Sequence, residues 1–167
     1  MVPMELIGVK VQMPANSPIV VLREESGRNR ILPIFIGGAE AQAIAYALEG
    51  VEPPRPMTHD LLKIMLEELG ATVHQIQVTE LRDGTFYAEI TVWHAGTTSS
   101  VSARPSDAIA LAARLGTPIF AAEGVLDEAG HVEEVDEEGD ESGDDPDEMV
   151  EQFREFIDNV NPDDFAS

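Results

Sequence analysis

The sequence predicts an α+β fold in which a mainly antiparallel sheet is covered by about three helices. Apolar and polar residues alternate in several short segments, which is typical of half-buried strands. Two of these segments flank Asp83-Gly84, a strong signal for a β-hairpin. Between the groups of predicted strands lie segments whose apolar residues recur at helical spacing. These segments are expected to form helices that pack on one antiparallel sheet.

The chain opens with three predicted strands, over residues 4–13, 19–22 and 31–36. The first is expected to bury alternate residues, after which a turn forms near Asn16. A polar, glycine-containing stretch between the second and third strands favours a hairpin. The residues expected to be buried in the first strand are Ile7, Val9, Val11 and Met13.

An alanine-rich helix is predicted over residues 39–49, with Gly50 as its stop. We interpret the preceding Gly37-Gly38 pair as a tight turn that needs the backbone freedom of glycine. A phosphate-binding loop is the weaker interpretation, because no G-x-G-x-x-G or Gly-Lys-Ser/Thr pattern follows.

A second helix is predicted over residues 58–69, with a buried stripe of Leu62, Met65, Leu66 and Leu69. Strands over 72–82 and 85–94 then form the hairpin, with Phe86, Ala88, Ile90 and Val92 pointing inward and Tyr87 and Trp93 on the other face. A strand over 98–103, a helix over 106–115 and a short strand over 118–121 complete the body.

The charge of the chain is concentrated in its C-terminal part. The net charge is −22, and residues 127–167 hold 18 of the 32 acidic residues against one arginine, Arg154. We therefore predict a domain over 1–126, a disordered acidic linker over 127–145, an amphipathic helix over 146–160 and a tail over 161–167. The apolar stripe of that helix is Met149, Phe153, Phe156, Ile157 and Val160.

Composition excludes several classes of site. The chain has no cysteine, so disulfides, thiolate metal ligands and a cysteine nucleophile are excluded. The N-terminus lacks the pattern of a secretory signal, and no apolar run reaches the ~18 residues that span a membrane, so we expect a cytoplasmic protein. The body has only two lysines, Lys10 and Lys63, so any phosphate-binding site must be local rather than a broad basic surface.

Two segments of the chain echo each other: RPMTHDLL at 55–62 and RPSDAIAL at 104–111. Thr58 and Ser106 are expected to be N-caps, with acidic residues in the first turn of each helix. Capping does not explain an arginine before proline in both segments. Arg55 and Arg104 could form one anion clamp with the two helix starts, or either could pair with an acidic residue of the opposite segment.

These segments, together with ILPIFIGGAEAQAIAYAL at 31–48 and the continuation RPSDAIALAARLGTPIF, resemble the bifunctional nuclease domain family. The resemblance covers most of residues 4–126. It implies a compact, sheet-based α+β domain and, for the plant members, degradation of both RNA and DNA. It assigns a catalytic role to no particular residue of this sequence.

Phosphodiester hydrolysis requires a base, groups that neutralise developing charge and often metal-binding carboxylates. The family-matching segments supply Glu40, His59, Asp60 and Asp107 as catalytic candidates. We expect Asp60 and Asp107 to bind Mg²⁺ or Mn²⁺, and His59 to act as a base because histidine titrates near neutral pH. The anion-binding candidates are Arg55, Arg104, Thr58 and Ser106.

The sequence thus favours a metal-assisted nuclease acting on DNA or RNA, with no organic cofactor. The alternative is a non-catalytic regulatory module that binds an anion or a protein carboxylate. We further expect a homodimer, because strand edges and apolar residues are exposed. The C-terminal helix is expected to dock on its own domain, where it could compete with nucleic acid, or on a protein partner.

Overall fold

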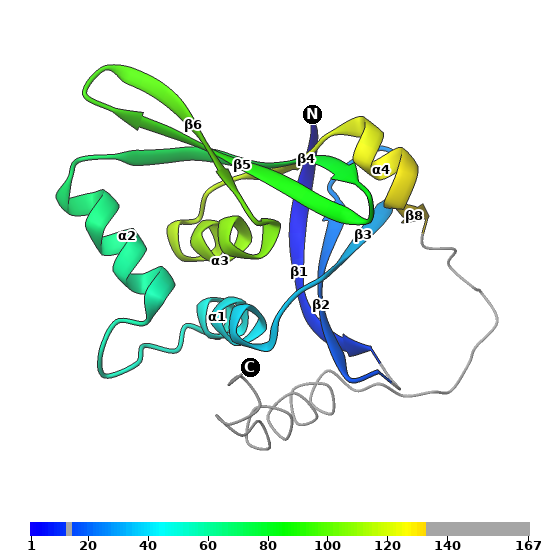
Figure 1. Ribbon diagram of the computed structural model, residues 1–167, viewed down its shortest axis with the longest axis horizontal. Coiled ribbons are helices and arrows are strands. Elements are labelled where there is room, and N and C mark those ends of the chain that lie inside the picture. Colours follow the sequence, from blue (N-terminus) through cyan, green and yellow to red (C-terminus); the bar gives the residue numbers. More distant parts are fainter. Residues whose placement is uncertain (13–14, 133–167) are drawn as a thin grey trace.

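The computed structural model describes residues 1–12 and 15–132. This part of the chain folds into one eight-stranded sheet with four helices, which confirms the predicted α+β class (Figure 1). The strands are β1 Val2–Gln12, β2 Ser17–Glu24, β3 Arg30–Phe35, β4 Thr72–Arg82, β5 Thr85–His94, β6 Thr97–Ala103, β7 Ile119–Ala121 and β8 His131–Val132. The helices are α1 Gly38–Glu49, α2 Thr58–Glu68, α3 Pro105–Leu115 and α4 Glu123–Ala129.

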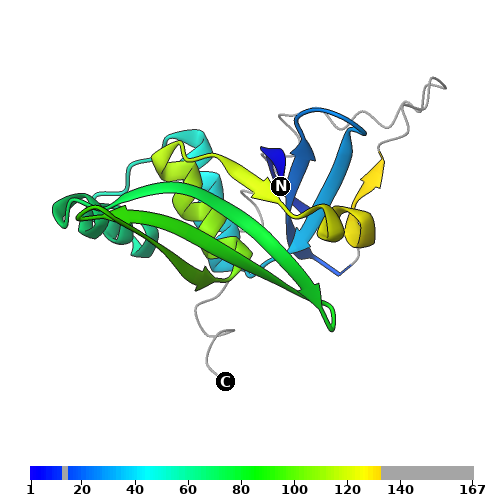
Figure 2. The same ribbon diagram turned by 90° about the horizontal axis from the view of Figure 1, so that it is seen from above.

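The strand order is β6-β5-β4-β7-β1-β2-β3-β8, and only the β4–β7 pair is parallel. The sheet twists so strongly that β4, β5 and β6 cross the direction of β1, β2 and β3, as Figure 2 shows from above. Helix α1 packs on β1 and β2, and α3 packs on β4 and β5. The core between them is aliphatic, and its largest fully buried side chains are Leu22, Leu32, Ile44, Ile76, Ile109, Leu111, Leu126, Val20 and Val78.

The hairpin about Asp83-Gly84 forms with the predicted bounds. Asp83 and Gly84 have φ values of 51° and 73°, the positive pair that a tight two-residue hairpin turn requires. Ala88 and Ile90 are buried on the predicted face of β5. Trp93 lies on the other face, where its side chain is 40% exposed.

The predicted facing of β1 is wrong in its first half. The pairing of β1 with β2 shifts between Leu6 and Gly8, so Ile7 is an extra residue in a β-bulge and is exposed. Val2 and Met4 are buried before the bulge, whereas Val9 and Val11 turn inward after it. Met13 lies outside the described residues.

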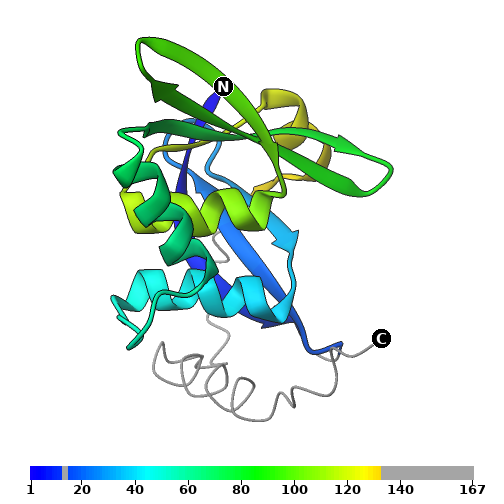
Figure 3. The same cartoon turned by 60° about the vertical axis from the view of Figure 1, so that its left-hand side comes forward.

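The predicted buried stripe of α2 is also wrong. Leu62, Met65 and Leu69 are exposed, and of the four predicted residues only Leu66 packs against the core. The reason is that α3 and α1 already cover the sheet, so α2 rests on α3 at the outer side (Figure 3). Its most buried residue is His59, at the start of the helix.

The folded domain extends beyond the predicted boundary at residue 126. Helix α4 continues to Ala129, and β8 then pairs with β3. Val125 and Leu126 are buried, and Asp127 pairs with Arg30 at 3.1 Å, so this acidic stretch has both apolar and charged partners. The rest of the predicted linker, the helix over 146–160 and the tail over 161–167 lie outside the described residues.

None of the helices in the described part of the chain has the length and apolar character needed to cross a membrane.

Candidate active site

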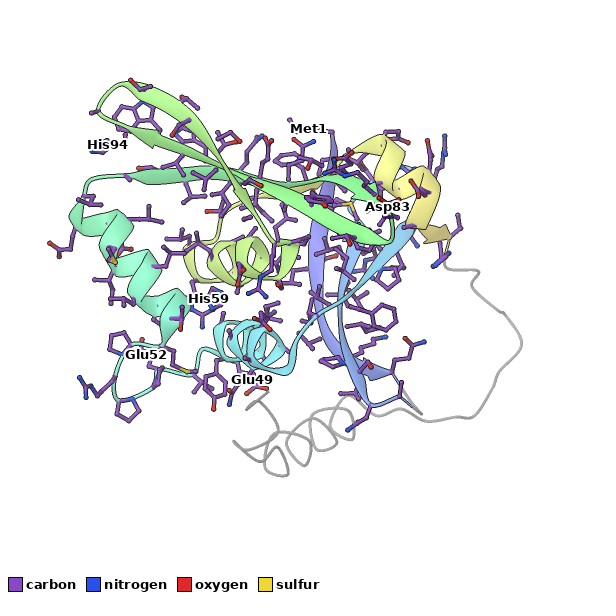
Figure 4. All side chains as sticks on the ribbon, in the orientation of Figure 1. Met1, Glu49, Glu52, His59, Asp83 and His94 are labelled. Carbon is purple, nitrogen blue, oxygen red and sulfur yellow. The ribbon has the colours of Figure 1, made fainter. Side chains whose placement is uncertain are left out.

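The two Arg-Pro segments come together at the N-terminal ends of α2 and α3. The ring Nε2 of His59, at the start of α2, lies 3.1 Å from Oδ1 of Asp107, in the first turn of α3. Figure 4 shows His59 in the region where α1, α2 and α3 meet. The His59 side chain is 11% exposed and that of Asp107 is 31% exposed, so the pair lies partly inside the domain and remains accessible through Asp107.

The predicted N-caps are wrong by one residue in α2 and by two in α3. Met57 and Arg104 occupy the cap positions, and neither provides a side-chain cap. Instead, the backbone N–H of Met57 donates to Oδ2 of Asp60 at 2.9 Å, which secures the first turn of α2. Thr58 is the first helical residue, and Ser106 is a buried residue in the first turn of α3.

Arg104 joins Asp107 to Glu40. Its Nε donates to Oδ2 of Asp107 at 2.7 Å, and its Nη2 donates to Oε1 of Glu40 at 2.9 Å and to Oδ1 of Asp107 at 3.1 Å. Glu40 lies in the first turn of α1, so this arginine connects the beginnings of α1 and α3. We call His59, Asp107, Arg104 and Glu40 the His59 cluster.

Asp60 does not belong to the His59 cluster. Its Oδ1 accepts a hydrogen bond from Nε of Arg114 at 2.5 Å, and Arg114 also donates to the backbone oxygens of Ala43 and Ala110. Arg114 was not among the sequence candidates. Its side chain is only 6% exposed because it is packed between the helices. The spacing of residues along one helix does not reveal such packing.

Arg55 contributes nothing to the cluster in the described residues. It is exposed in the loop between α1 and α2, and no ion pair forms there with the described part of the chain. The ion pair that one interpretation expected between an arginine of one segment and an aspartate of the other does not form among the described residues. The two segments are joined instead by the hydrogen bond between His59 and Asp107.

Neighbouring arginines lower the pKa values of Asp107 and Asp60 and so favour their anionic forms. Burial raises the pKa of Asp107, but hydrogen bonds from Arg104 and His59 outweigh burial and hold it below its usual value. Burial likewise opposes the ionisation of Asp60, and the hydrogen bonds from Arg114 and Met57 leave its pKa lowered. The pKa of Arg104 is raised, mainly by its hydrogen bond to Asp107.

The predicted metal ligands do not fit a preformed metal site. Among residues 1–12 and 15–132, no group of three or more histidine, aspartate or glutamate side chains is arranged to hold an ion. Asp60 and Asp107 are instead each paired with an arginine. A cation bound at either carboxylate would therefore lie beside the positive charge of a guanidinium.

A glycine is needed at position 37 because the Glu40 side chain occupies the space of a Cβ, and not because of the backbone conformation. Its φ of −77° is accessible to any residue, so the predicted need for glycine freedom at this position is wrong. A Cβ added at Gly37 would lie 2.2 Å from Oε2 of Glu40. The glutamate carboxylate therefore occupies the space beside the glycine.

Replacing Gly37 with alanine is thus expected to displace the Glu40 carboxylate and weaken its contact with Arg104, with a fold that stays intact because the end of a flexible side chain can move. Glu40→Gln is the matched variant, since it removes the charge without the clash. Any activity or nucleic-acid affinity measured for the protein should fall similarly in both variants, with thermal unfolding within a few degrees of the wild type. An unaltered Gly37→Ala variant would contradict the role of Glu40.

Comparisons with known proteins show which family this chain belongs to. The family model described as the bifunctional nuclease domain matches residues 20–134, which include every member of the His59 cluster. An uncharacterized protein of Mycobacterium tuberculosis is 43% identical over 164 residues, covering 97% of this chain and 96% of that protein.

Two plant proteins are similar over a shorter stretch. Bifunctional nuclease 1 of Oryza sativa subsp. indica is 31% identical over 103 residues, covering 60% of this chain and 31% of the rice protein. Bifunctional nuclease 1 of Arabidopsis thaliana is 31% identical over 108 residues, covering 63% of this chain and 33% of that protein. The chain thus spans about a third of the length of these plant relatives.

Proposed function

This chain belongs to the bifunctional nuclease domain family, and from that premise we propose that it is a phosphodiester hydrolase acting on DNA, RNA or both. The plant relatives carry the name of nucleases, and the matched region contains the whole His59 cluster. The observation that carries the proposal is the contact between His59 and Asp107, because it joins a base to a carboxylate beside an accessible arginine.

The contact defines how His59 would act. With the N–H of Nε2 donated to the Asp107 carboxylate, the lone pair resides on Nδ1, which has no hydrogen-bond partner among the described residues. Nδ1 is then the atom that takes a proton from the attacking water. Asp107, whose pKa is lowered, remains anionic and stabilises the imidazolium that forms.

Arg104 would stabilise the charge that develops on the phosphate. Its side chain is 67% exposed, and Nη1 makes no hydrogen bond with the described part of the chain. The N–H groups of Nη1 can therefore reach a phosphate oxygen while Nε and Nη2 remain bound to Asp107 and Glu40. Glu40 is a positioning residue in this scheme, since it holds Arg104 and touches no substrate.

Metal assistance by Mg²⁺ or Mn²⁺ remains a prediction from the sequence. No step of the proposed mechanism passes through a metal, because both candidate carboxylates are paired with arginines. Cleavage measured first in EDTA and then with each added ion decides whether an ion is needed.

The test of the proposal is cleavage of end-labelled single- and double-stranded DNA and RNA by purified protein. We expect cleavage by the wild type and a loss of about a hundredfold or more in Arg104→Gln, because the group that neutralises developing charge is removed. Arg82→Gln is the matched control, since Arg82 is an exposed arginine on β4 outside the cluster. Equal rates in all three proteins would point to a contaminating nuclease.

The rival function is a non-catalytic module that binds an anion. The pairing of Arg104 with two carboxylates favours it, because such a network can hold a ligand without activating water. Binding of nucleic acid without cleavage under every metal condition would support the rival. Homodimerisation and docking of segment 146–160 also remain predictions, the former supported by the exposed apolar side chains of α2.

A further inference from the structure

A cavity of about 490 Å³ opens beside the His59 cluster. We call it the α3 cavity, because Arg104, Pro105 and Ser106 at the start of α3 form one wall. The end of β3 with Gly37, the β4–β5 turn with the start of β5, and the start of β2 with the residue before it form the others. The volume is in the range of small-molecule sites, which is large enough for one nucleotide but not for a duplex.

Polar donors in the α3 cavity lack partners in the described part of the chain. Ser106 lines the cavity at 7% relative exposure, and none of the side-chain hydrogen bonds of the described residues involves its hydroxyl. No fully buried polar side-chain atom of these residues lacks a partner, so the hydroxyl is open to the cavity. Nη1 of Arg104 is likewise unpartnered. A guanidinium N–H and a hydroxyl that are open to one cavity can both donate to the oxygens of one anion, so these two groups together indicate an anionic ligand.

The charge of the lining supports the same ligand. Among the lining residues, Arg104 alone carries a charge, although the chain as a whole has a net charge of −22. A second cavity of the same volume lies between α1, α2 and α3, and three carboxylates and two cations line it. These are Glu52, Asp60, Glu67, Lys63 and Arg114. A phosphate would be repelled there, whereas the α3 cavity has a cation and no carboxylate in its lining. Asp107 and Glu40, which pair with Arg104, lie outside that lining.

An exposed aromatic ring completes the α3 cavity. Phe35 ends β3 and is 64% exposed, and Phe86 of the facing hairpin is half-buried beside it in the lining. A ring left in solvent beside unpartnered phosphate donors can stack on a base. Such stacking needs a base whose faces are open, because in a duplex neighbouring bases cover them.

We infer that the α3 cavity binds one nucleotide of a single-stranded nucleic acid, with its phosphate at Arg104 and Ser106 and its base stacked on Phe35. The inference rests on the proposed function for the choice of nucleic acid as ligand. It adds the strand state of the substrate and the place where it binds. Since Arg104 contacts both the cavity and Asp107, the bound phosphate touches the His59 cluster at Arg104 and is separated from Asp107 by that one side chain.

The test measures binding apart from cleavage. A fluorescein-labelled oligothymidylate of about ten nucleotides with a hydrolysis-resistant phosphorothioate backbone is titrated with protein, and a hairpin duplex serves for comparison. Phe35→Ala is expected to weaken single-strand affinity by about tenfold to a hundredfold, the effect of one lost base–aromatic stack. Phe35→Tyr should bind like the wild type. Trp93→Ala, which removes an exposed aromatic of β5 away from the cavity, should also leave affinity unchanged.

The phosphate contact is tested by Ser106→Ala, which should weaken binding severalfold whichever base is present. Wild-type affinity in Phe35→Ala, or an equal loss for strand and duplex, overturns the inference. If either of these results is found in a protein that cleaves nucleic acid, the proposed hydrolysis still stands. Conversely, binding that depends on Phe35 in a protein that never cleaves refutes the hydrolysis and keeps the inference.

Discussion

Replacing His59 with alanine is expected to lower kcat/KM for phosphodiester cleavage by about 10²–10⁴-fold, the usual contribution of a general base. The only hydrogen bond of its ring in the described residues is to Asp107, so the substitution removes the base and leaves Arg104 and Glu40 in contact with each other. Substrate affinity should therefore change much less than kcat. The measurement is steady-state cleavage of a labelled oligonucleotide with a separate determination of Kd.

His74→Ala is the matched control for that loss, because His74 is an exposed histidine on β4 and is not a member of the cluster. It should cleave like the wild type. Since His59 is itself buried, unfolding of the His59→Ala variant must be measured too, and added imidazole should restore part of its activity if only the base is missing. A folded His59→Ala variant with full activity would contradict the mechanism.

The sheet and most helices could be predicted because their signals are local. The β4–β5 hairpin depends on Asp83-Gly84 and alternating neighbours, and these are read within one short window. Which residues of β1 point into the core could not be predicted around Ile7. A β-bulge inserts one residue there and reverses the alternation, and the sequence carries no clear local signal for it. The apolar stripe of α2 was real as a pattern, but α3 lies between that helix and the sheet, which only tertiary structure determines.

In the candidate site, too, some features could be predicted from local sequence and others depend on tertiary structure. The residue types and both segments were found from the sequence, and their meeting at His59 and Asp107 agrees with the idea of one shared location. The partners of each charge depend on distances across α1, α2 and α3. Asp60 therefore turned out to pair with Arg114, and Glu40 with Arg104, although no sequence spacing connects either pair.

A buried ion pair far from the cluster was missed for a related reason. Glu24 of β2 accepts hydrogen bonds from Nε and Nη2 of Arg30 at 2.9 and 3.1 Å and from its backbone N–H at 3.2 Å. Both side chains are 5% exposed. Arg30 also pairs with Glu123 and Asp127, so the network attaches α4 to the edge of the sheet. The sequence around these residues resembles an ordinary polar hairpin turn.

Replacing Glu24 with alanine is expected to reduce the free energy of unfolding by about 3–5 kcal/mol, because it leaves the buried Arg30 guanidinium with only partly exposed partners. That is a large share of the ~5–15 kcal/mol that stabilises a typical domain. Glu5→Ala is the matched control: its pair with Arg23 is 53% and 40% exposed, and its loss should cost about 1 kcal/mol or less. Urea unfolding at pH 7 measures both.

The same network makes the difference between wild type and Glu24→Ala depend on pH. The hydrogen bond from Arg30 lowers the pKa of Glu24 more than burial raises it, so the carboxylate stabilises the folded state above the unfolded pKa of ~4.3. That contribution is lost as the pH falls through the lower pKa of the folded protein. The two proteins should therefore differ fully at pH 7 and converge in strong acid. A constant difference across this range, or a Glu24→Ala variant as stable as Glu5→Ala at pH 7, would show that the Glu24 carboxylate does not stabilise the fold through its buried pair with Arg30.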